Sequence, residues 1–180
     1  MYRRIPVCLA LCIPLFSYAG SSPDSLCPAA EKTYFTCLAK NGKTVSVCGS
    51  QDLQAESSFL QYRYGRMNQT PELVYPASPR NPRGLFEFSN TGMGAKASVR
   101  NLRFHIGRYT YIVFRSTAVH DPETAGVEVS RDGKQTLIEC KANVYSDTPG
   151  VASVYHVDEQ HFYEIQNIDL PEIARDELVY

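Results

Sequence analysis

Hydrophobic and polar positions alternate along the chain in short runs, and turn residues separate these runs. The run at residues 34–48 surrounds Asn41-Gly42, a pair typical of a type I′ turn between two β-strands. Counting outward from this turn pairs Leu38 with Val45. The register predicts two faces for the hairpin: Leu38, Val45 and Val47 on one, and Phe35, Cys37 and Cys48 on the other.

Two further hairpins are predicted in the second half of the chain. Gly107-Arg108 fits a type II′ turn, and Asp132-Gly133 is a second turn pair. The expected cross-strand pairs are Ile106 with Tyr109, Phe104 with Tyr111, Leu102 with Val113, Val127 with Ile138 and Val129 with Thr136. Cys140 then falls on the apolar face of its strand, so we expect its side chain to be buried.

The remaining elements are predicted from shorter patterns. They are strands at 59–65 and 72–75, an irregular loop at 77–94 with one short strand at 85–88, and a last strand at 151–155. Near the C-terminus, Phe162, Ile165 and Ile168 recur at helical spacing and predict a short helix.

These elements predict an all-β fold with minor α structure at the C-terminus. Hairpins that follow one another with turn signals favour an antiparallel barrel or sandwich of about eight strands. The chain has 180 residues with 43% hydrophobic content, which suits one folded domain, and we assign that domain to residues 20–180.

Residues 1–19 have the pattern of a signal peptide. Arg3 and Arg4 precede an apolar stretch, and small residues at Ser17 and Ala19 are typical of a cleavage site after Ala19. The apolar stretch is too short for a membrane span. We therefore expect an exported protein without a membrane span, located in the periplasm or secreted.

Four cysteines follow the predicted signal peptide: Cys27, Cys37, Cys48 and Cys140. An even number of cysteines behind an export signal predicts disulfides, and the spacing matches no zinc pattern. The preferred pairing is Cys37 with Cys140 and Cys27 with Cys48, because a Cys37–Cys48 bridge would be diagonal in the predicted hairpin. The alternative pairing, Cys37–Cys48 with Cys27–Cys140, stays open.

Arginine and tyrosine are interleaved along the middle strands, a composition enriched at protein interfaces. One interpretation is that the arginines lie on solvated strand faces and the tyrosines pack inside. The other is a binding surface on the middle strands and the 77–94 loop. Its candidate binding residues are Tyr62, Arg63, Arg83, Arg103 and His105.

Other chemistry has little support in the sequence. The chain has no Gly-x-Ser-x-Gly elbow and no His-Glu-x-x-His motif, and its carboxylates are scattered, so we assign no catalytic residue, metal site or cofactor. A net charge of −1 removes the usual argument for nucleic acid.

Several motifs are shared with known exported proteins. Tyr34-x-x-Cys37, then Lys43 and Val45 after the turn, and the late Cys140 resemble the small envelope lysozyme inhibitors of bacteria. That resemblance implies a disulfide-tied antiparallel β-barrel, although the chain lacks the Ser-Gly-x-x-Tyr inhibitory loop of that family. The stretches 60–65 and 72–76 look similar to uncharacterised exported proteins of Gram-negative bacteria.

The sequence therefore favours a non-enzymatic exported protein that binds a protein partner. An inhibitor or immunity factor against a lytic enzyme or toxin is one such protein. Two alternatives remain: an envelope hydrolase or small-ligand carrier with a site inside a barrel, and a structural component of the envelope.

Overall fold

The computed structural model describes residues 25–92, 97–118, 123–141 and 159–174. The predicted signal peptide at 1–19 and the predicted strand at 151–155 lie outside the described residues.

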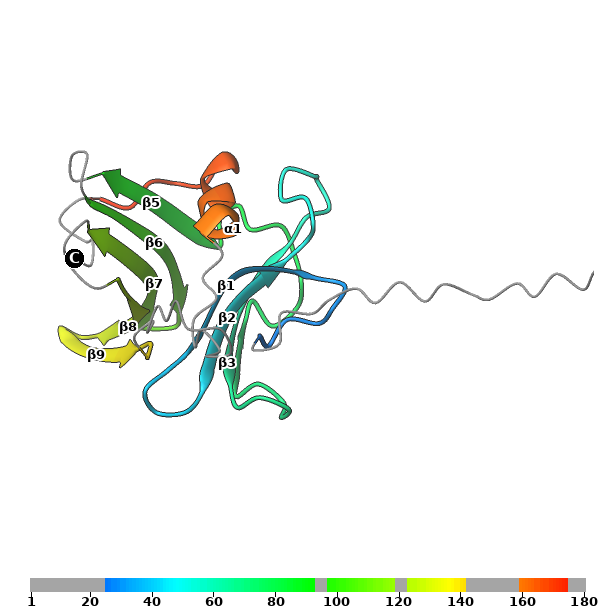
Figure 1. The fold of residues 1–180 in the computed structure, drawn as a ribbon. Helices are drawn as coiled ribbons and strands as arrows, with labels where there is room; N and C mark the ends of the chain where they lie inside the picture. The colour runs from blue at the N-terminus through cyan, green and yellow to red at the C-terminus, as the bar shows by residue number, and fades with distance from the viewer. Residues whose placement is uncertain (1–24, 93–96, 119–122, 142–158, 175–180) are drawn as a thin grey trace, which may run out of the picture.

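Two antiparallel sheets face each other (Figure 1). The first sheet contains, in spatial order, β1 (Lys32–Leu38), β2 (Thr44–Gly49), β3 (Leu60–Gly65) and β4 (Leu73–Tyr75). The second contains β5 (Phe86–Gly92), β6 (Ala97–Ile106), β7 (Tyr109–Ala118), β8 (Thr124–Arg131) and β9 (Lys134–Glu139). The predicted all-β class is confirmed, and of its two forms the structure shows a sandwich, because the sheets do not close into a barrel.

One corner joins the two sheets. An isolated antiparallel bridge pairs Ala39, after β1, with Cys140, after β9. Lys40 donates its backbone N–H to Glu139, and Lys141 donates to Leu38, each at 2.8 Å. The sheets are therefore hydrogen-bonded to each other at this corner alone among the described strands.

A short helix, α1 (Glu159–Glu164), and the 3₁₀ turn η2 (Ile165–Asn167) lie at one end of the sandwich (Figure 1). α1 contacts β1 and η2 contacts β5, so this segment bridges the two sheets. Phe162 and Ile165 are 0% exposed, which confirms the predicted helix up to Ile165. Ile168 is also buried, at 5% exposed, but it follows the 3₁₀ turn in an extended conformation.

The turn of the first hairpin differs from the prediction. Ala39 donates to the Lys43 carbonyl at 2.7 Å, and Gly42 donates to the Ala39 carbonyl at 2.9 Å. Gly42 has φ 79°, whereas Asn41 is not among the described residues with positive φ. The connection is thus a three-residue loop that ends in a left-handed glycine, not a two-residue type I′ turn.

This extra loop residue shifts the register by one. Cys37 pairs with Val45 and Phe35 pairs with Val47, so the predicted pairing of Leu38 with Val45 is wrong. A one-residue shift moves side chains to the opposite face. Phe35, Cys37, Val45 and Val47 share the core face, and the predicted grouping of the two faces is corrected accordingly.

The hairpin of β6 and β7 has the predicted register. Ile106 pairs with Tyr109, and the other expected pairs follow along both strands. Gly107 has φ 59°, and Arg108 is not among the described residues with positive φ, as a type II′ turn requires.

The hairpin of β8 and β9 also matches its prediction. Val127 pairs with Ile138, and Asp132 and Gly133 both have positive φ, at 49° and 76°. Cys140 is 5% exposed, which confirms that its side chain is buried.

The segment predicted as a loop at 77–94 contains more strand than expected. β5 runs from Phe86 to Gly92 and pairs along its length with β6, as the edge strand of the second sheet. The predicted strand at 85–88 covered only its beginning. Asn90 and Gly92 weaken the strand pattern, but pairing with the long strand β6 extends β5 through them.

Aromatic side chains fill the space between the sheets. The Phe104 ring stacks on Tyr75 and Tyr111 at centroid distances of 4.8 and 5.0 Å and contacts Tyr62 at 5.0 Å. Phe162 of α1 contacts the Phe35 ring at 5.3 Å. Most of the tyrosine and phenylalanine side chains that the structure describes pack in or against this core.

The preferred disulfide pairing is confirmed. Cys37–Cys140 joins the two sheets inside the core, and Cys27–Cys48 joins residues 25–31, here called the leading segment, to β2. Cys37 and Cys48 lie on opposite faces of the hairpin, which accounts for the absence of a bridge between them. No helix in the described part of the chain is long and apolar enough to cross a membrane.

Candidate functional site

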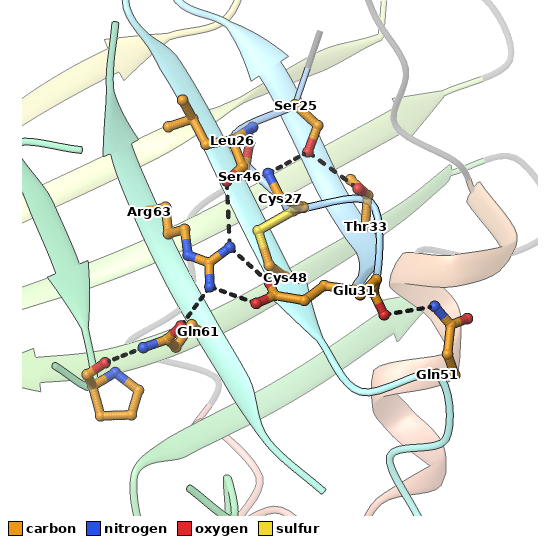
Figure 2. A network of polar contacts seen from close by, with 12 residues as sticks. Ser25, Leu26, Cys27, Glu31, Thr33, Ser46, Cys48, Gln51, Gln61 and Arg63 are labelled. Atoms are coloured by element: carbon orange, nitrogen blue, oxygen red, sulfur yellow. Dashed lines mark hydrogen bonds and ion pairs between the residues drawn. A yellow bond between two sulfur atoms is a disulfide. The ribbon is translucent and has the colours of Figure 1, made fainter. Parts of the chain in front are cut away.

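Arg63 lies on the face of the first sheet that points away from the core, and its guanidinium is enclosed by acceptors (Figure 2). Its two terminal nitrogens donate to the Glu31 carboxylate at 2.7 and 2.9 Å. Further bonds run to the side-chain oxygen of Gln61 at 2.6 Å and to the Leu26 carbonyl at 3.3 Å. The Arg63 side chain is only 10% exposed, so this predicted binding residue contacts its own chain.

The leading segment covers Arg63 because several bonds hold the segment against β2 (Figure 2). Leu26 donates its backbone N–H to the Ser46 hydroxyl at 3.0 Å, and Cys27 is bridged to Cys48. The Ser25 hydroxyl accepts the N–H of Cys27 at 3.0 Å. Both faces of β2 are consequently buried, one by the core and one by the leading segment.

Tyr62, the neighbour of Arg63, points into the core. It is 1% exposed and contacts the rings of Phe104 and Tyr111. Burial is the main cause that raises the pKa of its phenol well above the ordinary value. Tyr62 thus packs against the second sheet from the core side, and almost none of its surface is accessible to a partner.

Arg103 and His105 lie together on the outward face of the second sheet. Arg103 donates through Nε to the Glu87 carboxylate at 2.6 Å, and His105 Nε2 is 4.0 Å from the same carboxylate. His105 Nδ1 is also 3.1 Å from the Thr110 hydroxyl. The structure thus brings two of the five predicted residues into one polar cluster, in the sheet opposite Arg63.

A small hollow lies beside this cluster, with a volume of about 160 Å³. Glu87 and His105 line it together with Gly84 and Pro171. Arg83 precedes Gly84 and is exposed, and its backbone N–H donates to the Asn81 side chain at 3.0 Å. The five predicted residues therefore divide between a buried pair, Tyr62 and Arg63, and a surface group around Glu87.

A larger pocket, of about 390 Å³, opens beside β7, β8 and β9, toward the opposite edge of the second sheet. We call it the Tyr109 pocket, and its lining residues are Tyr109, Val129, Arg131, Asp132, Lys134 and Thr136. They belong to β7, β8, β9 and the β8–β9 turn. Two cations and one carboxylate line the pocket, so it is positively charged within a chain of net charge −1.

Strand alternation places these side chains together. In the confirmed register, Tyr111 pairs with Val129, Val129 with Thr136, and Arg131 with Lys134. Val129 packs against the core, so its face is the core-facing side of the sheet. The pocket is the continuation of that face past the end of the packed core, where polar residues replace apolar ones.

Arg131 is held in place over the ring of Tyr109. Its guanidinium carbon is 5.0 Å from the ring centroid, and Nη1 donates to the Tyr109 hydroxyl at 2.8 Å. Nε donates to Asp132 at 3.2 Å, and the other oxygen of Asp132 accepts a bond from Arg108 at 2.6 Å. The bonds to Tyr109 and Asp132 raise the pKa of Arg131, so its positive charge is retained.

The pocket remains open to a ligand despite these contacts. Tyr109 is 39% exposed, and the side chains of Arg131 and Asp132 are 45% and 49% exposed. Lys134 forms no ion pair with any residue that the structure describes. The arrangement therefore offers a fixed aromatic face and guanidinium beside a second cation, which together suit a carboxylate.

Sequence reasoning did not select Arg131 and Lys134. The signal was present, because the predicted register of this hairpin already placed both on the face of Val127 and Val129, next to the turn. The sequence does not show where the first sheet ends, and therefore not which residues of this face lie beyond the packed core. Among the described residues, no group of three or more His, Cys, Asp or Glu side chains could hold a metal ion.

The comparisons with known proteins add no relative to this picture. No family model, no curated protein and no solved structure matches the chain. The site is consequently interpreted from its own geometry alone.

Proposed function

We propose that this chain is an exported, non-enzymatic binding protein that recognises a protein partner through the Tyr109 pocket. One observation carries the proposal: Arg131 is fixed over the exposed ring of Tyr109 in the wall of an open, positively charged pocket. Arginine and tyrosine in such settings dominate the energetics of protein interfaces.

The chemistry of the pocket selects the partner group. Arg131 and Lys134 supply positive charge, and Val129 with the Tyr109 ring supplies an apolar wall. An acidic side chain on the surface of the partner fits this pocket, because its carboxylate can meet the two cations while its methylene groups lie against the apolar wall. Because Arg131 is already oriented by Tyr109 and Asp132, little side-chain freedom is lost when the partner binds.

Export is supported by the covalent structure. Disulfides form and persist in oxidising compartments, and this chain carries two. Together with the signal-like pattern at residues 1–19, they support a location in the periplasm or outside the cell. Inhibition of a lytic enzyme or immunity to a toxin is a role that fits a small, stapled binding domain in that location.

The aromatic core weighs against the alternative of a ligand carrier or hydrolase with an internal site. Phe104, Tyr111 and Tyr62 pack ring against ring between the sheets, in the space that such a site would occupy. The clusters around Arg63, Glu87 and Arg131 instead lie outside this aromatic core.

Affinity capture with matched variants tests the proposal. The chain without residues 1–19 is immobilised and exposed to the extracellular and envelope fractions of its source cells, and the captured partner is then titrated by calorimetry. We expect Arg131→Ala and Lys134→Ala each to weaken binding at least tenfold, and added salt to slow association.

Arg83→Ala is the matched control, because Arg83 is an exposed arginine remote from the Tyr109 pocket in the sheet order. It should bind as the unmodified protein does. Equal affinity of all three variants, or failure to capture any partner, would overturn the proposal.

A further inference from the structure

β9 is an exposed edge strand beside the Tyr109 pocket. It is last in the order of the second sheet, and most of its residues are exposed, including Leu137 at 51%. Edge strands present unpaired N–H and C=O groups that another chain can pair with.

The hydrogen bonds around β9 show which residues point outward. Cys140 donates inward to the Ala125 carbonyl at 3.0 Å, whereas Glu139 accepts from Lys40 and Lys141 donates to Leu38 on the opposite side, each at 2.8 Å. Bonding direction alternates along a strand, so Gln135 and Leu137 point outward as Glu139 does. Neither forms a backbone bond on that side with a described residue.

The chain itself uses part of this edge. The residues that follow β1 pair with the end of β9 through the bridge of Ala39 to Cys140. The edge is therefore competent for strand pairing, and the stretch from Gln135 to Leu137 is its continuation.

We propose that an extended acidic segment of the partner adds to β9 as a further strand, pairing with the backbone of Gln135 and Leu137. This inference rests on the proposed function, since it states how the partner of the Tyr109 pocket binds. Main-chain bonds to an edge provide affinity in such complexes, and pockets for alternate side chains provide specificity.

The side chains on the two faces of β9 determine which partner sequence can pair with this strand. Lys134 and Thr136 point to the pocket side, whereas Leu137 points to the other side. A strand placed about 4.8 Å away alternates in the same way. Its acidic residues would lie beside Lys134 and Thr136, with Arg131 one strand further in on β8, and the residues between them, beside Leu137, would be apolar.

Charge complementarity favours this occupant over a second copy of the chain. A second copy of β9 would bring Lys134 but no carboxylate to the pocket side, because its single acidic residue, Glu139, lies on the other face and is paired with Lys40. An acidic strand instead supplies the carboxylates that the pocket side of the edge lacks.

Two peptide probes test the strand addition. One is a twelve-residue peptide of alternating Glu and Val, and the other has Lys in place of each Glu. Added to the folded, disulfide-bonded protein, the Glu peptide should shift the amide resonances of Gln135 and Leu137 and slow their hydrogen exchange. The Lys peptide should bind at least tenfold more weakly.

The variant Leu137→Pro isolates the edge, because it removes an outward N–H without removing a bond to β8. We expect it to weaken binding of the Glu peptide at least tenfold, whereas Leu137→Thr, which keeps the N–H, stays within threefold. If Leu137→Pro does not fold, a Glu peptide N-methylated on alternate residues provides the same test on the unmodified protein.

The outcomes separate the two proposals. If Leu137→Pro and the N-methylated peptide bind normally while Lys134→Ala loses binding, strand addition is overturned and the pocket function stands. No binding of the Glu peptide at millimolar concentration, or equal binding of the Lys peptide, also overturns strand addition. Self-association on a sizing column that Leu137→Pro abolishes would show that a second copy is the occupant instead.

Discussion

Two arginine–tyrosine pairs, Arg63 with Tyr62 and Arg131 with Tyr109, differ sharply in their exposure to solvent. Arg63 is 10% exposed at its side chain and donates to Glu31, Gln61 and Leu26, while Tyr62 is 1% exposed. Arg131 is 45% exposed at its side chain, and Tyr109 is 39% exposed. The same two residue types stabilise the fold in one place and form an accessible surface in the other.

The difference arises from what lies over each strand. The leading segment covers the outer face of β3, and Cys27–Cys48 fixes the segment there. β9 is the last strand of its sheet, and the turn ends of β7 and β8 extend past the packed core. Composition therefore identifies arginine and tyrosine as interface-prone, but coverage by the rest of the chain decides which of them can meet a partner.

The largest expected effects come from the disulfides, which hold the covered face and the core together. The variant with both Cys37→Ser and Cys140→Ser opens a loop spanning 103 positions and should lose about 4 to 5 kcal/mol of unfolding free energy. The variant with Cys27→Ser and Cys48→Ser, with a separation of 21, should lose about 3 kcal/mol. Urea unfolding measures both losses.

The variant with Cys27→Ser and Cys48→Ser also tests whether the leading segment is what keeps Arg63 buried. Without Cys27–Cys48 the leading segment is held only by hydrogen bonds and the ion pair, so hydrogen exchange around Arg63 should accelerate. Exchange in β9 serves as the internal control and should not change. Unchanged protection around Arg63 would show that the polar network alone holds the segment.

Replacing each arginine gives the next largest difference. Arg63→Met leaves the Glu31 carboxylate, which is 16% exposed, without its partner, and should destabilise the protein by about 3 kcal/mol in urea unfolding. Arg131→Met removes a solvated pair, and its unfolding midpoint should coincide with that of the unmodified protein.

The double variant Arg63→Met, Glu31→Gln is the control for charge burial. It removes both charges, so it should recover part of the stability that Arg63→Met loses. Equal destabilisation by Arg63→Met and Arg131→Met would contradict the distinction between the two pairs.

Local turn chemistry allowed much of the second sheet to be predicted from the sequence. The pairs Gly107-Arg108 and Asp132-Gly133 each adopt the conformation that their residues favour, and the cross-strand register follows from them. Apolar residues on one face and polar residues on the other agree with that register, so two signals coincide.

In the first hairpin the two signals disagree, because the expected two-residue turn and the polar–apolar alternation predict different registers. Asn41-Gly42 suits a two-residue or a three-residue loop, because Gly42 is left-handed in both. The polar–apolar alternation agrees with the three-residue loop, because the observed register puts Phe35, Cys37, Val45 and Val47 on one face and Thr36 and Ser46 on the other. Burial does not distinguish the two faces, since Thr36 and Ser46 are 1% and 0% exposed. The leading segment that buries them acts at long range, which local patterns do not reveal.

The candidate site was predicted less well for a related reason. Interface composition selected Arg63 and Tyr62, whose exposure depends on the leading segment and the opposite sheet. The Tyr109 pocket exists because β7–β9 extend past the core, a relation between two sheets. The predicted registers imply a common face for Tyr109, Arg131 and Lys134, but their accessibility could not be derived from the hairpins alone.

The smallest expected effect appears at alkaline pH and concerns the buried tyrosine, Tyr62. Burial raises the pKa of Tyr62 above its ordinary value of 10.0, so above pH 10 the unfolded chain releases this proton while the folded chain keeps it. The stability contribution is complete below pH 10 and falls as the pH rises, by at most about 1.4 kcal/mol per pH unit. Tyr62→Phe should therefore flatten the decline of unfolding free energy between about pH 10 and 11.5, measured by urea titration. A Tyr62→Phe variant whose unfolding free energy declines as steeply as that of the unmodified protein would contradict the burial of this phenol.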